Sequence, residues 1–444
     1  MEQDKELAQE YSFFSLLKFV GPSIFVFVFI AVYQMVDGFF IDHFVNDAAI
    51  SAINLYYPIL CMFIALGIMF GTGGNAMIVR LVGEGNRKKA GQVFSELIIF
   101  TLGIGILITA ACLLAADPIM RLCGATDGNI DYLRPYYMVM SAFAIPIMMQ
   151  SMLGILVIGE GKTVTAAIVI MVGGVLNCAL DYLFMGPLQM GIYGAAIATV
   201  IGYFSTIVYA VFYYVIGKKS SYRLEWTKIR MKEIGKICFN GSSDLATNLA
   251  GSVTMLMMNH IAFRCYGEVG VSSLAVWSYM EFAIAAVFMG YTTAIEPLFS
   301  YHYGKGNTKE RQKLYRYSMA WTVIMGVILM AVLFIVRGQI IGLFFNPGTE
   351  YYDIAMRSLM FSLPACILIG INNFVSGMFT AFSNGLVSFI LSMIRTFVVF
   401  VVCIYALSAV FGGDGLWIAW PAAELVSLIP TFFCVKKFRS RYQY

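Results

Sequence analysis

Two acidic side chains interrupt apolar segments in the first half of this chain. Asp37 lies late in the first apolar run, and no lysine or arginine stands within two helical turns of it. Asp181 lies late in the fifth run, four residues after Asn177, so the amide and the carboxylate share one face of a helix. A charged side chain at the centre of a bilayer costs about 2.5–3.5 kcal/mol on insertion scales, so residues of this kind indicate function.

These two carboxylates suit the binding of a small cation. If both face one interior of low dielectric constant, they cannot both stay ionised at little cost, so Asp37 and Asp181 are expected to titrate as a coupled pair. Such a pair can take up a proton on one side of a membrane and release it on the other. The same carboxylates, with Asn177, also offer the oxygen ligands that Na⁺ would need. The structural alternative is that each acid only hydrogen-bonds a neighbouring helix.

The second half carries a different set of charges in apolar segments. Glu281 and Glu296 lie in the eighth run, and Arg395 lies in the eleventh, where it is the expected buried partner of these acids. A structural ion pair is one interpretation. The other is a cation or substrate site, because Pro297 follows Glu296 and should kink the helix beside the acid.

A few other polar residues have simpler interpretations. Glu96 and Asp244 lie near the ends of apolar runs and should reach the membrane interface, and His302 should be solvated at a basic helix end. The nine cysteines contain no CxxC motif and lie mostly in apolar runs, which indicates packing. We expect no metal centre, no cofactor and no catalytic nucleophile.

Composition defines the elements that must position these residues. Of the 444 residues, 60% are hydrophobic and 12% are charged, against about 45–50% and about 25% in soluble proteins. About 20 apolar residues cross a bilayer as a helix. We therefore predict an all-α integral membrane protein with twelve transmembrane helices. Their expected ranges are 14–40, 53–79, 93–116, 134–157, 164–185, 192–216, 237–263, 273–300, 316–336, 355–380, 386–410 and 416–435.

The sequence also contains an internal repeat. Residues 49–86 and 270–307 align without a gap, so the second copy lies 221 residues beyond the first. Both copies end in a similar signature, Gly83-Glu-Gly85-Asn86 and Gly304-Lys-Gly306-Asn307. Two similar membrane halves are typical of secondary transporters, which bind substrate between the halves. We predict two pseudo-symmetric six-helix lobes. Their boundaries are 1–216 for the N-lobe, 217–236 for a cytoplasmic linker and 237–444 for the C-lobe.

Charge predicts the orientation. Most of the 29 lysines and arginines lie in segments that share one side if both termini are cytoplasmic, as the positive-inside rule requires. The acidic N-terminus has no basic n-region, so the first run is expected to be a retained helix and not a signal peptide. The net charge of +4 therefore follows from topology and does not indicate nucleic-acid binding.

Several motifs along the whole chain resemble those of the MATE (multidrug and toxic compound extrusion) family, nearest its bacterial MepA-like and DinF-like branches. In chain order they are Gly21-Pro22, Val36-Asp37, Pro58, Gly83-x-Gly85-Asn86, Asn177-x-x-x-Asp181, Gly191-x-x-Gly194-Ala-Ala-Ile-Ala-Thr199, Pro297-Leu-Phe-Ser-Tyr301-x-Tyr-Gly304-x-Gly306-Asn307 and Trp417-Ile-Ala-Trp-Pro421-Ala-Ala-Glu424. Each motif is weak alone, but their order and spacing are specific.

The resemblance implies a V-shaped pair of six-helix lobes in the bacterial cytoplasmic membrane. It also implies alternating access and the export of drugs and cationic amphipathic small molecules in exchange for H⁺ or Na⁺. An N-lobe cation site would use Asp37, Asn177, Asp181 and Thr199, with Tyr136.

The chain departs from some branches of this family in its second half. Asn248 stands where those branches place an acid in the seventh helix, and the tenth helix has no internal acid, so a second-lobe Na⁺ site of that kind is not expected. Glu296 stands where relatives have an uncharged polar residue, which suggests an additional site for cationic substrates.

Other functions fit the sequence less well. A flippase for a lipid-linked sugar would favour a cavity rich in Arg and Lys, and Arg395 is the one deep basic residue here. An integral-membrane enzyme would need a catalytic motif, but the three histidines have no metal-ligand spacing. A passive channel does not require isolated titratable acids.

Overall fold

The structure is a computed structural model that describes residues 5–44, 47–127, 130–216, 220 and 222–444. Side chains of residues 34–54 and 216 also lie outside the described set. The helices are α1 Lys5–Ala8, α2 Phe13–Phe44, α3 Asp47–Gly83, α4 Arg87–Leu114, α5 Ala116–Leu122, α6 Ile130–Ala142, α7 Ala144–Gly159, α8 Thr163–Met185, α9 Gly191–Val211, α10 Met231–Gly304, α11 Thr308–Gly342, α12 Glu350–Ser362, α13 Ala365–Ala381, α14 Gly385–Met393, α15 Phe400–Phe411 and α16 Gly413–Tyr442, with π-helical turns η1 Phe212–Ile216 and η2 Ile394–Val399.

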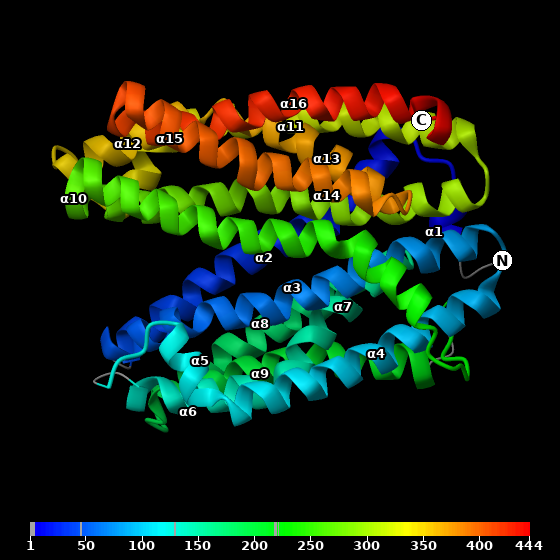
Figure 1. The fold of residues 1–444 in the computed structure, drawn as a ribbon, viewed down its shortest axis with the longest axis horizontal. Coiled ribbons are helices and arrows are strands. Elements are labelled where there is room, and N and C mark those ends of the chain that lie inside the picture. Colours follow the sequence, from blue (N-terminus) through cyan, green and yellow to red (C-terminus); the bar gives the residue numbers. More distant parts are fainter. Residues whose placement is uncertain (1–4, 45–46, 128–129, 217–219, 221) are drawn as a thin grey trace.

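The described helices confirm twelve membrane spans. Nine helices are long and apolar enough to cross a membrane, and the bent pairs α6–α7 (53°) and α12–α13 (51°) raise the number to eleven. Helix α10 has 74 residues, which is about 110 Å of helix for a bilayer core of about 30 Å. Its dihedral angles become non-helical at Gly267 (φ 61°, ψ −144°), and its two halves meet there at the end of the molecule far from both chain termini (Figure 1). Counting α10 as two spans gives twelve.

The internal repeat is visible in the helices themselves. Each half contains one bent pair of helices, α6–α7 in the first half and α12–α13 in the second. The second helix of the pair begins at Ala144 in one half and at Ala365 in the other, 221 residues apart. Helices α3, α4 and α6–α9 form one layer, and α10–α16 form the other (Figure 1). The two copies of the sequence therefore build two similar halves that pack side by side.

The repeated Gly-x-Gly-Asn signature has a clear local cause. Gly85 (φ 80°) and Gly306 (φ 75°) adopt the left-handed conformation that suits glycine after a helix. Asn86 and Asn307 then cap the next helix, since each side chain accepts a hydrogen bond of 3.2 Å from a backbone N–H three residues later. The signature thus ends one span and starts another in each half.

The first glycine of each signature lies where the halves cross. A Cβ atom on Gly83 would come within 2.2 Å of the Tyr301 carbonyl oxygen, and one on Gly304 within 2.1 Å of the Arg80 carbonyl oxygen. Because Tyr301 is the repeat counterpart of Arg80, this contact is reciprocal. Glycine is required here because the two backbones touch.

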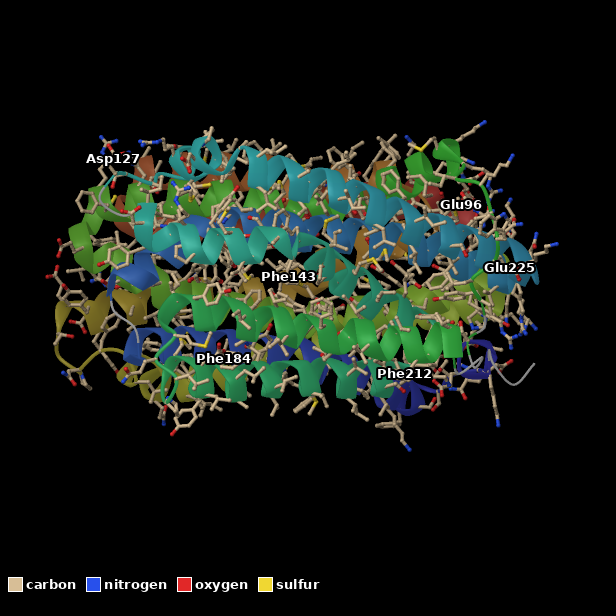
Figure 2. All side chains as sticks on the ribbon, turned by 90° about the horizontal axis from the view of Figure 1, so that it is seen from below. Glu96, Asp127, Phe143, Phe184, Phe212 and Glu225 are labelled. Carbon is tan, nitrogen blue, oxygen red and sulfur yellow. The ribbon has the colours of Figure 1, made fainter. Side chains whose placement is uncertain are left out.

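Side chains divide along the long axis of the molecule. Apolar side chains such as Phe143 and Phe212 cover its middle, and nitrogen-bearing side chains gather at the end that holds Glu225 (Figure 2). Both chain termini lie at one end of the molecule (Figure 1). An apolar belt of this kind is what a lipid-facing surface requires.

Candidate functional site

Three of the predicted N-lobe residues lie on two neighbouring helices. Asp181 and Asn177 lie one turn apart on α8, with exposed fractions of 0% and 4%. The Asn177 Nδ2 atom donates to Thr199 Oγ1 on α9 at 3.5 Å, and the Thr199 hydroxyl donates to the Ala195 carbonyl at 3.0 Å. The structure therefore brings Asn177 and Thr199 together, with the Asp181 carboxylate buried one turn away.

Small residues allow α8 and α9 to approach this closely. A Cβ atom on Gly202 would lie 3.1 Å from both the Cβ atom of Asn177 and the carbonyl oxygen of Gly173. One on Gly173 would lie 2.5 Å from Ser205 Oγ. These contacts hold the amide of Asn177 against α9.

Asp37 belongs to α2, but its side chain lies outside the described residues. Helix α2 packs on α8 through its side chains, because a Cβ atom on Gly174 would lie 2.8 Å from the Phe29 ring and 3.5 Å from the Tyr33 ring. The backbone of residue 37 lies about one helical turn beyond Tyr33 on the same helix.

Tyr136 is buried on α6 within an aromatic cluster. Its ring meets that of Tyr56 on α3 edge to face, with centroids 5.4 Å apart. Tyr137 packs on the other edge of Tyr56 at 5.7 Å and donates to the Cys112 carbonyl at 2.8 Å. Packing accounts for these contacts of Tyr136, which remains a candidate for the cation site.

In the second half, Arg395 is held by a residue that the sequence analysis did not pair with it. Its Nη1 atom lies 3.6 Å from Glu424 Oε1, and both side chains are about nine-tenths buried. Its Nη2 atom donates to Asn373 Oδ1 at 3.1 Å. The other carboxylate oxygen of Glu424 accepts from Asn372 at 2.7 Å. Arg395 thus sits in a hydrogen-bonded network, and the expected ion pair with Glu281 or Glu296 is wrong among the described residues.

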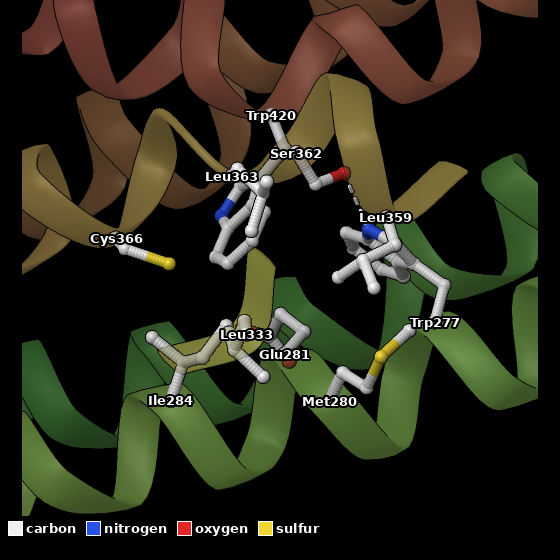
Figure 3. A pocket seen from close by; sticks show the side chains of 10 residues that line it. All are labelled: Trp277, Met280, Glu281, Ile284, Leu333, Leu359, Ser362, Leu363, Cys366 and Trp420. Carbon is white, nitrogen blue, oxygen red and sulfur yellow. Dashed lines mark hydrogen bonds between the residues drawn. The ribbon is translucent and has the colours of Figure 1, made fainter. Parts of the chain in front are cut away.

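Glu281 lies near this network in a tight space. Arg395 and Glu424 both interact electrostatically with its carboxylate. Its side chain lines a cavity of about 10 Å³ beside Trp277 and Trp420 (Figure 3). The Trp277 indole N–H donates to Ser362 Oγ at 2.7 Å, which closes one wall. A cavity of this size holds at most one water molecule, so it is a packing site and not a drug site.

Glu296 lies elsewhere on α10. Its side chain is 8% exposed, and its Oε1 atom lies against α13, where a Cβ atom on Gly377 would come within 2.5 Å of it. Asp244, on the first half of the same helix, is the charged group that acts on it. A kink was expected at Pro297. Helix α10 instead continues through Pro297 to Gly304, and its non-helical backbone angles lie at Gly267.

Three polar residues are placed differently from the expectation of a solvated or interfacial position. Glu96 is fully buried, and its carboxylate pairs with Arg230 of the linker at 2.6 Å. Glu96 and the linker residue Glu225 lie at the same end of the molecule (Figure 2). His302 is also fully buried. Asp244 is half-buried and accepts a hydrogen bond from Thr72 of α3 at 2.7 Å. An acid within an apolar run was the only sequence signal for Asp244.

The linker is fastened to the first half of the chain. The side chain of Tyr222 is 2% exposed, and its hydroxyl donates to the Leu156 carbonyl at 3.0 Å. Tyr213 and Ser220 donate to the Glu160 carboxylate. Burial raises the pKa of Tyr222 well above its usual value of 10, so the ring stays neutral where it docks. Among the described residues, no cluster of three or more His, Cys, Asp or Glu side chains could hold a metal ion.

Comparisons with known proteins agree with this architecture. The family model MatE matches the chain twice, at residues 22–183 and 243–405, and the two matches begin 221 residues apart. The multidrug export protein MepA of Staphylococcus saprophyticus is 25% identical over 97% of this chain and 94% of its own length. MepA of Staphylococcus haemolyticus is also 25% identical, over 96% and 93%.

Solved structures share the fold. A crystal structure of a MATE in complex with MaL6 has a TM-score of 0.93 at 22% identity, covering 100% of this chain and 99% of the other. An outward-facing multidrug resistance transporter of the MOP superfamily has the same TM-score, identity and coverage.

Proposed function

The chain belongs to the MATE family of membrane transporters, and from this premise we propose that it exports organic cations and drugs in exchange for H⁺ or Na⁺. It is a transporter and not an enzyme. The observation that carries the proposal is the group formed by the buried Asp181 and Asn177 of α8 and the half-buried Thr199 of α9. A carboxylate with no exposed surface is costly to keep charged, so it responds strongly to a small cation.

In the proposed cycle, the cation and the substrate bind different states. Entry of the cation from outside neutralises Asp37 and Asp181, which favours a lobe packing with weak affinity for substrate. Release of the cation inside restores the charge and the affinity for a cationic drug. Coupling requires that each ligand bind one conformation better than the other, and it is reciprocal between the two ligands.

We assign the cation site to Asp37, Asn177, Asp181 and Thr199, with Tyr136 at its border. In the second half, we keep Glu296 as the acid that faces substrate. Arg395 and Glu281 receive structural roles instead, which is supported by the network around Glu424 and by the tight packing around Trp277.

The lobe boundaries 1–216, 217–236 and 237–444 and the cytoplasmic position of both termini are part of the same proposal. The gathering of basic side chains at one end of the molecule supports that orientation (Figure 2). The long apolar helices make it a multi-span membrane protein, and we place it in the cytoplasmic membrane of a bacterium.

The experiment is efflux of a fluorescent lipophilic cation from proteoliposomes. A proton gradient and a sodium gradient are imposed separately on the wild-type protein and on Asp37→Asn. We expect one gradient to drive efflux and the variant to lose that drive while it inserts normally. Normal efflux by Asp37→Asn would remove Asp37 from the site, and no efflux under either gradient would refute the proposed exchange.

A further inference from the structure

One tryptophan is placed unlike the others. The chain has five tryptophans, and all of them lie in the described part of the chain. Four belong to the second half and are at most 6% exposed, namely Trp277, Trp321, Trp417 and Trp420. The fifth, Trp226 of the linker, is 99% exposed. An indole has an apolar ring and a polar N–H, so an exposed one in a membrane protein suits the boundary between bilayer and water.

The linker presents one side to the protein. Residues 223–230 form no helix and run along α4. The backbone N–H of Glu225 donates to Ser95 Oγ at 2.8 Å, and the Thr227 hydroxyl lies 3.1 Å from Glu96 Oε1. These two contacts are two residues apart, which is the spacing of one side of an extended chain.

The opposite side of this segment is exposed. Leu224, Trp226 and Lys228 alternate with the residues that contact α4, and all three side chains are exposed. The exposed apolar side chains Ile229 and Met231 continue this surface to the start of α10. Adjacent exposed apolar side chains beside basic ones are typical of an interaction surface.

This surface lies at the level that a lipid headgroup layer would occupy. Helix α4 begins at Arg87 with three consecutive basic residues, and its first exposed apolar side chain is Ile99. Ser95 and Glu96, which contact the linker, lie between these two levels. Glu96 and Glu225 also lie at the end of the molecule where nitrogen-bearing side chains gather (Figure 2). The linker therefore borders the apolar belt on its basic side.

The charge of the segment is positive. Residues 223–232 contain four basic residues against one acid, Glu225; the basic ones are Arg223, Lys228, Arg230 and Lys232. Arg230 is neutralised by Glu96. The side chains of Lys228 and Lys232 are exposed, and within the described part of the chain neither has an ion-pair partner. Basic residues beside a bilayer attract anionic lipids, each by about fivefold.

We propose that segment 223–232 is a binding surface for anionic phospholipid, with Leu224 and Trp226 in the interfacial layer and Lys228 and Lys232 on the phosphate groups. This goes beyond the proposed function, because it concerns the bilayer and not the transported ion or drug. Lys228 precedes α10, and Lys232 lies in its first turn. The connection between the halves is thus attached to the membrane on one side and to α4 on the other.

The test uses the fluorescence of Trp226 in the purified full-length protein in nanodiscs. Subtracting the emission of Trp226→Phe from that of wild type isolates this residue from the four buried tryptophans. The nanodiscs mix phosphatidylcholine and phosphatidylglycerol, and one lipid at a time carries bromine, a contact quencher, on its acyl chains. Bromine near the headgroup should quench Trp226 more strongly than bromine near the chain end, and aqueous iodide should quench it weakly.

The same signal measures the preference for anionic lipid. At equal mole fraction, brominated phosphatidylglycerol should quench Trp226 more than brominated phosphatidylcholine. Lys228→Gln/Lys232→Gln should lower this enrichment about fivefold or more. The matched control Lys436→Gln/Lys437→Gln removes two exposed lysines from α16, in the other layer, and should quench as wild type does (Figure 1). Thermal unfolding of each variant reports folding.

The quenching pattern can overturn the proposal in several ways. If iodide quenches Trp226 freely and brominated lipid does not, the residue lies in water. If neither quencher reaches it, protein covers it, such as a second copy of the chain. Equal quenching by the two brominated lipids in wild type would refute the anionic preference. An unchanged preference in folded Lys228→Gln/Lys232→Gln would refute the assignment of the two lysines.

Discussion

Asp181 and Asp244 are both acids in apolar helices, yet their surroundings differ in one decisive respect. Asp181 lies on α8 in the first half and has no exposed surface. Asp244 is half-buried and reaches across to Thr72 in the other half. The difference separates an acid enclosed within one half from an acid at the contact between the two halves. A third acid, Glu424, shows what a structural role looks like, because it has Arg395 beside it.

The largest effect should come from Asp181. Asp181→Asn removes the enclosed charge, so gradient-driven efflux should fall by about a hundredfold, near the upper range of measured coupling between sites. Its equilibrium binding of the lipophilic cation tetraphenylphosphonium should weaken as well, because the proposed cycle links affinity for the drug to the charge of this site. Asp244→Asn leaves the enclosed acid in place, so its efflux should still respond to the gradient. Identical profiles for the two variants would break the comparison.

Removing the partner of a structural acid should instead cost stability. Arg395→Met leaves Glu424 as a buried, uncompensated charge, which typically lowers the free energy of unfolding by about 3–5 kcal/mol. The double variant Arg395→Met/Glu424→Gln should recover most of that loss, since no charge remains and Asn372 keeps a side-chain partner. Unfolding in mixed micelles measures both. If the double variant were as unstable as the single one, the charge would not be the cause.

A smaller effect should follow from separating the two halves at Gly73. In Gly73→Ala, the new Cβ atom would lie 2.1 Å from the Ile237 carbonyl oxygen, and overpacking of this kind costs about 1–3 kcal/mol. Cysteine cross-linking between α3 and α10 should slow as Thr72 moves away from Asp244. Gly103→Ala is the matched control, because its Cβ atom has no neighbour within 4 Å.

The smallest effect should come from an acid on the surface. Asp127 pairs with Arg121 at 2.6 Å, but its side chain is 87% exposed, and exposed ion pairs contribute about 0–1 kcal/mol. Asp127→Asn should therefore leave efflux, probe binding and thermal unfolding as in wild type. A loss of efflux in this variant would show that removing any acid disturbs the protein, which would weaken the conclusions from Asp181.

Sequence patterns predicted the parts of the fold that depend on local or repeated signals. The apolar runs predicted the twelve spans, and the offset of 221 reappears in the bent pairs, whose second helices begin at Ala144 and Ala365. The i,i+4 spacing placed Asn177 and Asp181 on one helix face, and the family resemblance added Thr199, which Asn177 contacts.

The remaining contacts depend on which helix faces reach one another across long separations. Thr72 and Asp244 are 172 residues apart, and nothing in either segment names the other. Arg395 was expected to meet Glu281 or Glu296, but the packing of α16 gives it Glu424. Glu96 was expected near the interface because it lies near the end of an apolar run. The linker covers it through Arg230, and the linker has no periodic pattern that would predict this contact.

The docked linker has a mechanical consequence. The covalent connection between the halves is long in sequence, but Tyr222 is anchored under α7, and Arg230 is tied to Glu96, one residue before α10 begins at Met231. The free part of the connection is therefore only the backbone between Arg230 and Met231. Any rocking of one half on the other must bend at that joint, and lengthening the segment between the two anchors would add no slack.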